Sequence, residues 1–192
     1  MSELFEIRWH GRGGQGAKTA AILFADAGAG EGKYVQAFPE YGPERMGAPV
    51  QAFNRLSNEP ITLHCGIDSP SVVVVLDPTL IETAKVTQGL KENGMLLINT
   101  NQPPNIMRQN LPDFKGKLFT VDASTISKQE LGKEIPNTPM LGALIKVTNL
   151  IDFDRMLQDT RKKLEKKFKS KPEVIEGNIK SIQRAYQEVK GE

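Results

Sequence analysis

The residues best suited to binding chemistry form a glycine-rich cluster near the start of the chain, consisting of Gly11, Arg12, Gly13, Gly14, Gln15 and Gly16. An apolar segment that favours a strand precedes the cluster, and an alanine-rich segment that favours a helix follows it. Glycine lets a backbone approach an anion closely, and the first N–H groups of a helix carry a partial positive charge. Arg12 can add a bidentate phosphate contact. The cluster therefore predicts a phosphate site, a backbone contact between subunits, or a tight turn with close helix–strand packing.

The spacing of Gly11, Gly13 and Gly16 matches the G-x-G-x-x-G pattern of dinucleotide-binding proteins. That pattern also needs an acidic residue at the end of the second strand, where it binds the ribose hydroxyls. The nearest acidic residues, Glu31 and Glu40, lie outside the predicted second strand, which disfavours NAD(P) binding. A P-loop is disfavoured as well, because one extra residue before the lysine rotates that lysine by about 100° around the helix.

Metal and cofactor ligands are scarce, since the chain has one cysteine and two histidines. It cannot by itself hold a cysteine-ligated iron–sulfur cluster, and a zinc site is disfavoured. We expect His10 and Cys65 to be structural, and we predict no catalytic residue and no bound cofactor in this chain alone. The basic run from Arg161 to Lys171 is expected to be a solvated helix face, with docking of an acidic partner chain as the alternative.

The composition is that of an ordinary soluble globular protein, with 25% charged residues, 39% hydrophobic residues and a net charge of +2. This balance does not call for nucleic acid or a membrane surface, and 6% aromatic residues are too few for a base-stacking surface. The first residues lack the long apolar core of a signal peptide, and every apolar run is too short to span a bilayer. We therefore expect a cytoplasmic protein.

Strand-like and helix-like segments alternate, which predicts an α/β, Rossmann-like fold with a mostly parallel sheet and helices on both faces. The β-branched run Ser71–Leu76 is typical of a strand buried on both faces. The predicted strands are 4–9, 33–38, 50–56, 71–76, 95–99 and 117–121. The predicted helices are 17–29, 78–90, 124–131 and 138–151, with two more in the tail on either side of Pro172. We expect an α/β domain over 1–151 and a helical C-terminal extension over 152–192.

Three segments together give the chain a resemblance to a known family. They are the glycine cluster with its flanking strand and helix, the loop Phe-Pro-Glu-Tyr-Gly-Pro-Glu-Arg-Met-Gly-Ala from Phe38 to Ala48, and the segment Asn-Thr-Pro-Met-Leu-Gly-Ala from Asn137 to Ala143. In this order they resemble the γ subunit of 2-oxoacid:ferredoxin oxidoreductases, and the likeness extends from residue 3 to about residue 150. Ala48 stands where many relatives have a second glycine. The loop is most similar to the pyruvate branch of the family.

The resemblance implies a role in oxidative decarboxylation, in which pyruvate and coenzyme A (CoA) give acetyl-CoA, carbon dioxide and reduced ferredoxin. It implies α, β and δ partner subunits that hold thiamine diphosphate, Mg²⁺ and [4Fe–4S] clusters, with ferredoxin as a partner of the whole complex. Under this interpretation the glycine cluster contacts the phosphates of CoA, and a rigid loop contacts neighbouring subunits through Glu40, Tyr41, Glu44 and Arg45. The alternatives are a γ subunit for 2-ketoisovalerate, 2-oxoglutarate or indolepyruvate, a stand-alone NAD(P)-binding protein, and a non-catalytic interaction module.

Overall fold

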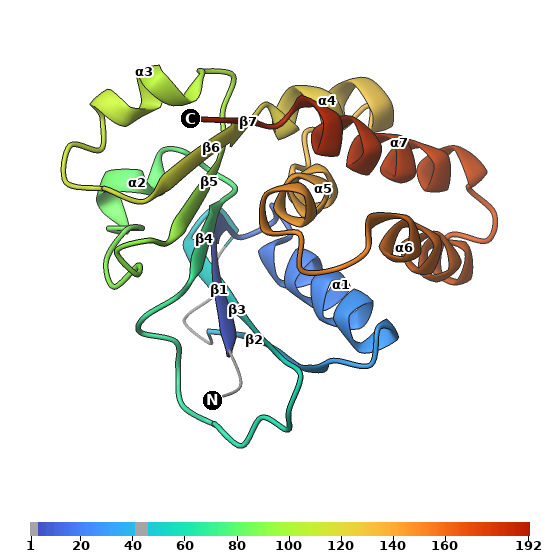
Figure 1. The fold of residues 1–192 in the computed structure, drawn as a ribbon. Helices are drawn as coiled ribbons and strands as arrows, with labels where there is room; N and C mark the ends of the chain where they lie inside the picture. Colours follow the sequence, from blue (N-terminus) through green and yellow to red (C-terminus); the bar gives the residue numbers. More distant parts are fainter. Residues whose placement is uncertain (1–3, 41–45) are drawn as a thin grey trace.

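The computed structural model describes residues 4–40 and 46–192, which form a seven-stranded sheet with helices on both faces (Figure 1). The strand order is β2-β3-β1-β4-β5-β6-β7. The strands are β1 (Phe5–Arg12), β2 (Tyr34–Pro39), β3 (Pro49–Ser57), β4 (Val72–Val75), β5 (Met95–Asn99), β6 (Lys117–Val121) and β7 (Lys190–Gly191). The helices are α1 (Ala17–Gly30), α2 (Leu80–Thr83), α3 (Pro104–Gln109), α4 (Ala123–Leu131), α5 (Asn137–Thr148), α6 (Phe153–Lys167) and α7 (Pro172–Glu188).

The sheet has a parallel centre and antiparallel edges. Strands β1, β4, β5 and β6 run in one direction. Strand β3 lies antiparallel between β1 and β2, and β7 lies antiparallel beside β6. Strands β2 and β3 are separated only by residues 40–48, a connection that is too short to contain a crossover helix. An antiparallel pair of strands does not need a crossover helix. The predicted α/β class with a mostly parallel core is confirmed, and the antiparallel edges complete the sheet.

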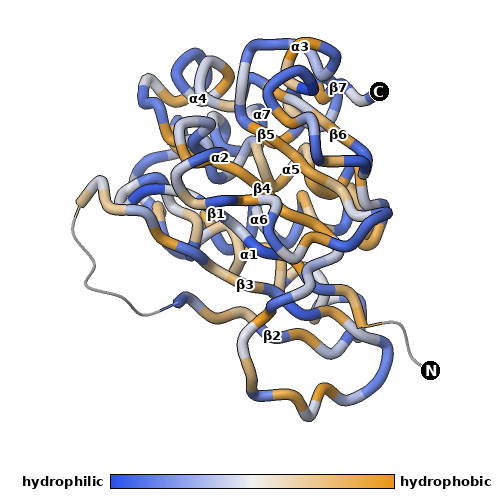
Figure 2. Tube along the Cα trace, turned by 90° about the vertical axis from the view of Figure 1, so that its left-hand side faces the viewer, coloured by the Kyte–Doolittle hydropathy of each residue, from blue (hydrophilic) through white to orange (hydrophobic). Residues whose placement is uncertain are grey.

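The central strands alternate their side chains between two hydrophobic layers. Val72 and Val74 belong to the layer on the side of α1 and α5, whereas Val73 and Val75 belong to the layer on the side of α2 and α3. All four side chains are fully buried. Figure 2 shows the hydrophobic stretches of β4 and β5 running through the interior. This double burial explains why the strand is a continuous β-branched run and does not alternate apolar with polar residues.

Helix α1 lies close to the sheet because most of its buried positions, with the exception of Phe24, are small. Ala17, Ala20 and Ala21 are buried against it. A Cβ atom added at Gly28 would lie 2.5 Å from Leu56 Cδ1, so a larger residue at that point would require the Leu56 side chain to shift. The close packing fixes the start of α1 against the end of β1, where the glycine cluster lies.

The C-terminal helices share the core of the preceding residues. Ile182 and Ala185 of α7 are buried in the same hydrophobic layer as α1 and α5. The backbones of α5 and α7 approach closely, because a Cβ added at Gly142 would collide with the Ile182 carbonyl group and lie 3.0 Å from its carbon. The division of the chain at residue 151 stays a prediction.

Several predicted elements differ from the structure. The helix predicted over 78–90 is limited to α2, because Lys85 and Gly89 adopt left-handed backbone angles (φ 43° and 74°) that end a helix. Helix α4 begins at Ala123, one residue before the predicted start, because the Asp122 carboxylate caps it by accepting from Thr125 N at 3.0 Å. Helix α3 and strand β7 were not predicted, since both are too short for a periodic pattern.

Candidate functional site

The glycine cluster and the described end of the loop 38–48, residues 46–48, meet at the carboxyl end of β1. The backbone N–H of Gly13 donates to the Ala48 carbonyl (2.9 Å), and the N–H of Gly47 donates to the Gly13 carbonyl (3.1 Å). These bonds continue the antiparallel ladder in which Arg12 pairs with Pro49. Two of the three segments that carried the resemblance are therefore hydrogen-bonded to each other.

The third segment reaches the same place through Asn137, the first residue of α5. Gly16 has a left-handed backbone (φ 83°) and caps the start of α1. A Cβ added at Gly16 would collide with the Asn137 side chain, 2.9 Å from its Cγ and 3.1 Å from its Cβ. Two features therefore favour glycine at position 16, namely the left-handed backbone angle and the Asn137 side chain that lies against it. We call the region formed by residues 11–16, 46–48 and Asn137 the glycine site.

Arg12 is held in the glycine site by its own chain. Its Nε donates to Asp77 Oδ2 (3.0 Å), its Nη1 to the Gly47 carbonyl (3.1 Å) and its Nη2 to Thr79 Oγ1 (2.8 Å). Gln15 Nε2 donates to the same Asp77 oxygen (3.0 Å). The predicted anion contact of Arg12 is therefore already taken by a carboxylate, although the arginine side chain remains 33% exposed.

Asp77 is the charge that the sequence analysis missed. Desolvation raises the pKa of Asp77, but hydrogen bonds from Thr79 and Gln15 and the charge of Arg12 outweigh it, so its pKa lies below the ordinary value. Asp77 and Thr79 follow β4 directly. Polar residues just after a buried parallel strand are a signal for a site at the sheet edge, and this signal could have identified them.

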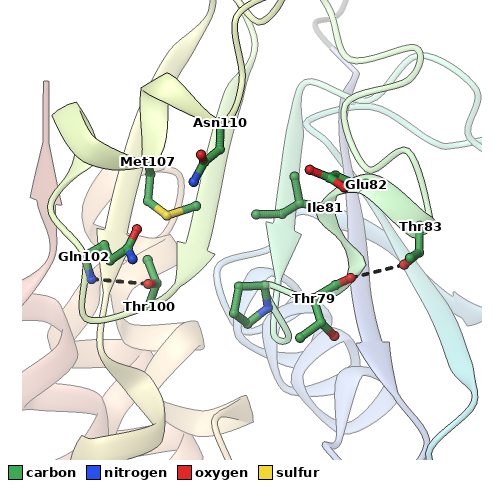
Figure 3. A pocket seen from close by; sticks show the side chains of 9 residues that line it. Thr79, Ile81, Glu82, Thr83, Thr100, Gln102, Met107 and Asn110 are labelled. Atoms are coloured by element: carbon green, nitrogen blue, oxygen red, sulfur yellow. Dashed lines mark hydrogen bonds between the residues drawn. The ribbon is translucent and has the colours of Figure 1, made fainter.

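The glycine site lies where an α/β sheet usually binds ligands. The connection after β1 leads to one face of the sheet and the connection after β4 to the other, as α1 and α2 show in Figure 1. A crevice forms at such a switch point, outside the carboxyl ends of the strands. A cavity of about 470 Å³ adjoins it between the loops after β4 and β5 (Figure 3). Thr79 lines this cavity together with Glu82, Thr100, Gln102 and Met107, so the cavity offers hydroxyl, carboxylate, amide and thioether groups.

The predicted interface residues are described only in part. Glu40 is exposed, and its backbone N–H donates to the Gln51 carbonyl at 3.1 Å. Tyr41, Glu44 and Arg45 lie outside the described residues. The next residue, Met46, is 95% exposed, which is unusual for a large hydrophobic side chain. Gly47, beside it, is bonded to the glycine site.

The side chain of His10 is buried, and its structural role stays a prediction. It is 2% exposed, and its Nε2 accepts from Arg8 Nε at 3.0 Å. Burial and the charge of Arg8 lower the pKa of His10 to about 4, so the ring is neutral near pH 7. Cys65 is exposed, and its Sγ accepts a contact from Arg55 Nη2 at 3.7 Å.

Metal sites and membrane-spanning helices are not found in the described part of the chain. Within residues 4–40 and 46–192, no three His, Cys, Asp or Glu side chains gather as metal ligands would. None of the helices in those ranges combines the length and the apolar character that crossing a bilayer requires.

The strand order separates this site from a dinucleotide-binding site. In a dinucleotide fold the acidic residue ends the strand next to β1. Here β3 lies between β1 and β2, so the end of β2 is about 10 Å away from β1 at ordinary strand spacing. The glycine pattern is therefore present without the neighbouring strand that NAD(P) binding needs.

The chain belongs to the pyruvate ferredoxin/flavodoxin oxidoreductase family, whose model matches residues 6–188. It is 48% identical to pyruvate synthase subunit PorC of Thermotoga maritima over 186 residues, which cover 97% of this chain and 95% of that one. It is 51% identical over 151 residues to the common subunit gamma of the pyruvate/ketoisovalerate oxidoreductases of Pyrococcus abyssi, covering 79% of this chain and 82% of that one. The crystal structure of pyruvate oxidoreductase subunit PORC from Thermotoga maritima matches with a TM-score of 0.85 and 46% identity over 98% of each chain. The family inferred from three segments is confirmed.

Proposed function

We propose that this chain is the gamma-type subunit of a pyruvate:ferredoxin oxidoreductase, which oxidises pyruvate with CoA to acetyl-CoA and carbon dioxide and reduces ferredoxin. The observation that carries this proposal is the convergence of the three resembling segments on one site, the glycine site. The similarity to subunits named for pyruvate, over nearly the whole chain, supports pyruvate as the substrate. Since a similar archaeal subunit is named for ketoisovalerate as well, a gamma subunit shared by two substrates is the second candidate.

Thiamine diphosphate, Mg²⁺ and the [4Fe–4S] clusters are assigned to the α, β and δ partner subunits. The residues of this chain do not fit these groups, since it has one cysteine and the described residues hold no cluster of metal-ligating side chains. Those cofactors supply the decarboxylation and electron-transfer steps, and ferredoxin docks on the complex. We place the complex in the cytoplasm.

The part that we assign to this chain is binding of CoA at the glycine site. The phosphates of CoA suit the N–H groups at the start of α1, which have no partners within the helix, and the exposed third of the Arg12 side chain. The uncharged part of CoA suits the neighbouring cavity beside Thr79. Arg12 uses three of its five N–H donors within the chain, so a phosphate would bind a guanidinium whose charge Asp77 already offsets.

The test is a pair of variants in the assembled complex. Asp77→Asn removes the competing charge and is expected to lower the KM for CoA, because the guanidinium is released to the ligand. Arg12→Gln combined with Asp77→Asn removes both charges without leaving one unpaired, and is expected to raise the KM for CoA about tenfold. The KM for pyruvate serves as the internal control and should change less than about twofold in both. Equal KM values for CoA in the wild type and both variants would show that the glycine site only shapes a turn.

We also propose that the loop from residue 40 to residue 49 contacts the thiamine-carrying subunits. Met46 supports this, because methionine is enriched in interface cores and this side chain is almost fully exposed in the single chain. Met46→Glu is expected to reduce co-purification of the partner subunits. Ile106→Glu, the same change at another exposed apolar residue, is the matched control. Equal recovery of partner subunits with both variants would contradict the proposal.

A further inference from the structure

A second cavity, of about 390 Å³, lies on the helical side of the molecule between α1, α6, α7 and the segment that joins α4 to α5. Asn137 separates it from the glycine site, and no part of the function above uses it. Its volume lies in the range of small-molecule sites, about 300–1,000 Å³. The interior is formed by apolar side chains, namely Leu23, Ile135, Leu164, Phe168 and Val174.

The charged side chains among the described residues that line this cavity are all lysines. Lys133, Lys163, Lys167 and Lys171 line it, and none of the described lining residues is acidic. Lys163 also pairs with Asp26 at 2.6 Å, whereas the other three are exposed and hold their ammonium groups at the solvent edge. Three of these lysines come from the basic run expected to be a solvated helix face. That run therefore has a second side, which faces an apolar cavity.

Two polar residues that line the cavity, Thr138 and Asn178, are hydrogen-bonded within the protein. Thr138 Oγ1 donates to Asn178 Oδ1 (2.9 Å), and Asn178 Nδ2 donates to the Val174 carbonyl (2.7 Å). These two residues therefore require no polar partner from a ligand, and burying an apolar group against the apolar side chains of the interior is favourable. The lysines at the edge, by contrast, favour an anion.

We propose that this lysine-rimmed cavity binds a small anionic amphiphile, with a carboxylate or phosphate group at the lysines and an aliphatic body in the apolar interior. The volume suits a single short chain, whereas a peptide from a partner subunit needs an extended groove. The site is independent of the CoA assignment, because it shares with the glycine site only the side chain of Asn137.

The binding test uses the full chain and the assembled complex, each titrated with octanoate, octyl phosphate and octylammonium in a calorimeter. The two anions should bind to both preparations, and the cation about tenfold more weakly or not at all, since it meets four lysines. The ratio of the two anion affinities identifies the headgroup that the rim prefers. Equal binding of octylammonium overturns the proposal. The proposal is also overturned if the anions bind to the single chain but not to the complex, because a partner subunit then covers the cavity.

Variants locate the binding at this cavity. Lys167→Glu with Lys171→Glu reverses two charges at the rim and should weaken octanoate at least about tenfold. Lys166→Glu with Lys169→Glu makes the same charge change on exposed lysines of the same run, and should change the affinity less than about twofold. Val174→Phe fills the interior and should abolish binding, with circular dichroism confirming that the variant is folded. Equal losses in both charge-reversed pairs, or full binding to a folded Val174→Phe variant, would place the amphiphile elsewhere and refute the assignment.

Discussion

Replacing Gly16 by alanine tests the geometry of the glycine site with a single methyl group. Two separate features of the structure oppose that methyl group. The backbone at Gly16 is left-handed (φ 83°), and the Asn137 side chain lies directly against it. Gly14 shares only the first feature, because its φ is 98° but a Cβ there meets no atom within 4 Å. Gly14→Ala is therefore the matched control.

The expected cost is the sum of these two effects. A left-handed backbone costs an L-residue about 1–2 kcal/mol. The new Cβ would lie 2.9 Å from Asn137 Cγ and 3.1 Å from its Cβ, well inside ordinary contact distances. Rotation about χ1 of Asn137 can relieve the contact with Cγ but not the one with Cβ, which is fixed to the first turn of α5, and such overpacking costs about 1–3 kcal/mol. Gly16→Ala should thus lower the free energy of unfolding by about 2–5 kcal/mol, and Gly14→Ala by about 1–2 kcal/mol.

Urea-induced unfolding at pH 7, followed by circular dichroism, measures both variants against the wild type. The slope with urea should be unchanged, so that differences in midpoint report stability. The decisive quantity is the difference between the two variants, because it isolates the contact with Asn137. A Gly16→Ala variant no less stable than Gly14→Ala would show that α5 does not lie against the glycine cluster.

Three further predictions concern the core. The pKa of His10 falls from 6.5 to about 4 on folding, so below pH 6.5 the unfolded chain binds a proton at this residue that the folded chain does not bind. Urea unfolding should therefore show that the free energy of unfolding falls by roughly 3 kcal/mol between pH 6.5 and pH 4. His10→Gln should remove this pH dependence. Asn54→Ala leaves the buried Trp9 indole N–H without its acceptor at 2.8 Å and should lower the unfolding free energy by about 2–4 kcal/mol in the same assay. Gly142→Ala forces a methyl group against the Ile182 carbonyl and should separate α7 from α5, which limited proteolysis detects as faster cleavage of the C-terminal helices.

Features that depend on neighbouring residues were predictable from the sequence. The run Val72–Val75 indicated a doubly buried strand because each of its side chains needs an apolar layer, whichever face it points to. The glycine cluster indicated a turn before a helix because left-handed angles, as at Gly14 and Gly16, strongly favour glycine. These local requirements do not depend on the rest of the chain.

Features that depend on strand pairing were not predictable. Arg12 and Asp77 are 65 residues apart, and they meet only because β4 pairs with β1. The placement of β3 between β1 and β2 likewise follows from pairing and not from composition. The left-handed angle at Lys85, which ends α2, has no glycine to signal it. A single sequence specifies the propensity of each segment, but the partner of each segment is decided by the packing of the whole sheet.

The ion pair between Arg12 and Asp77 makes phosphate binding at the glycine site a competition. A phosphate would share the guanidinium with a carboxylate that Thr79 and Gln15 also hold, so the partly neutralised Arg12 would add little net free energy to its binding. Under the proposed function, the single chain therefore binds CoA weakly. Under the same proposal, a partner group that took over the hydrogen bonds of Asp77 would release the guanidinium and strengthen CoA binding. Because such coupling is reciprocal, CoA then stabilises the assembled complex by the same factor, and the affinity of the partner subunits for this chain should rise when CoA is present.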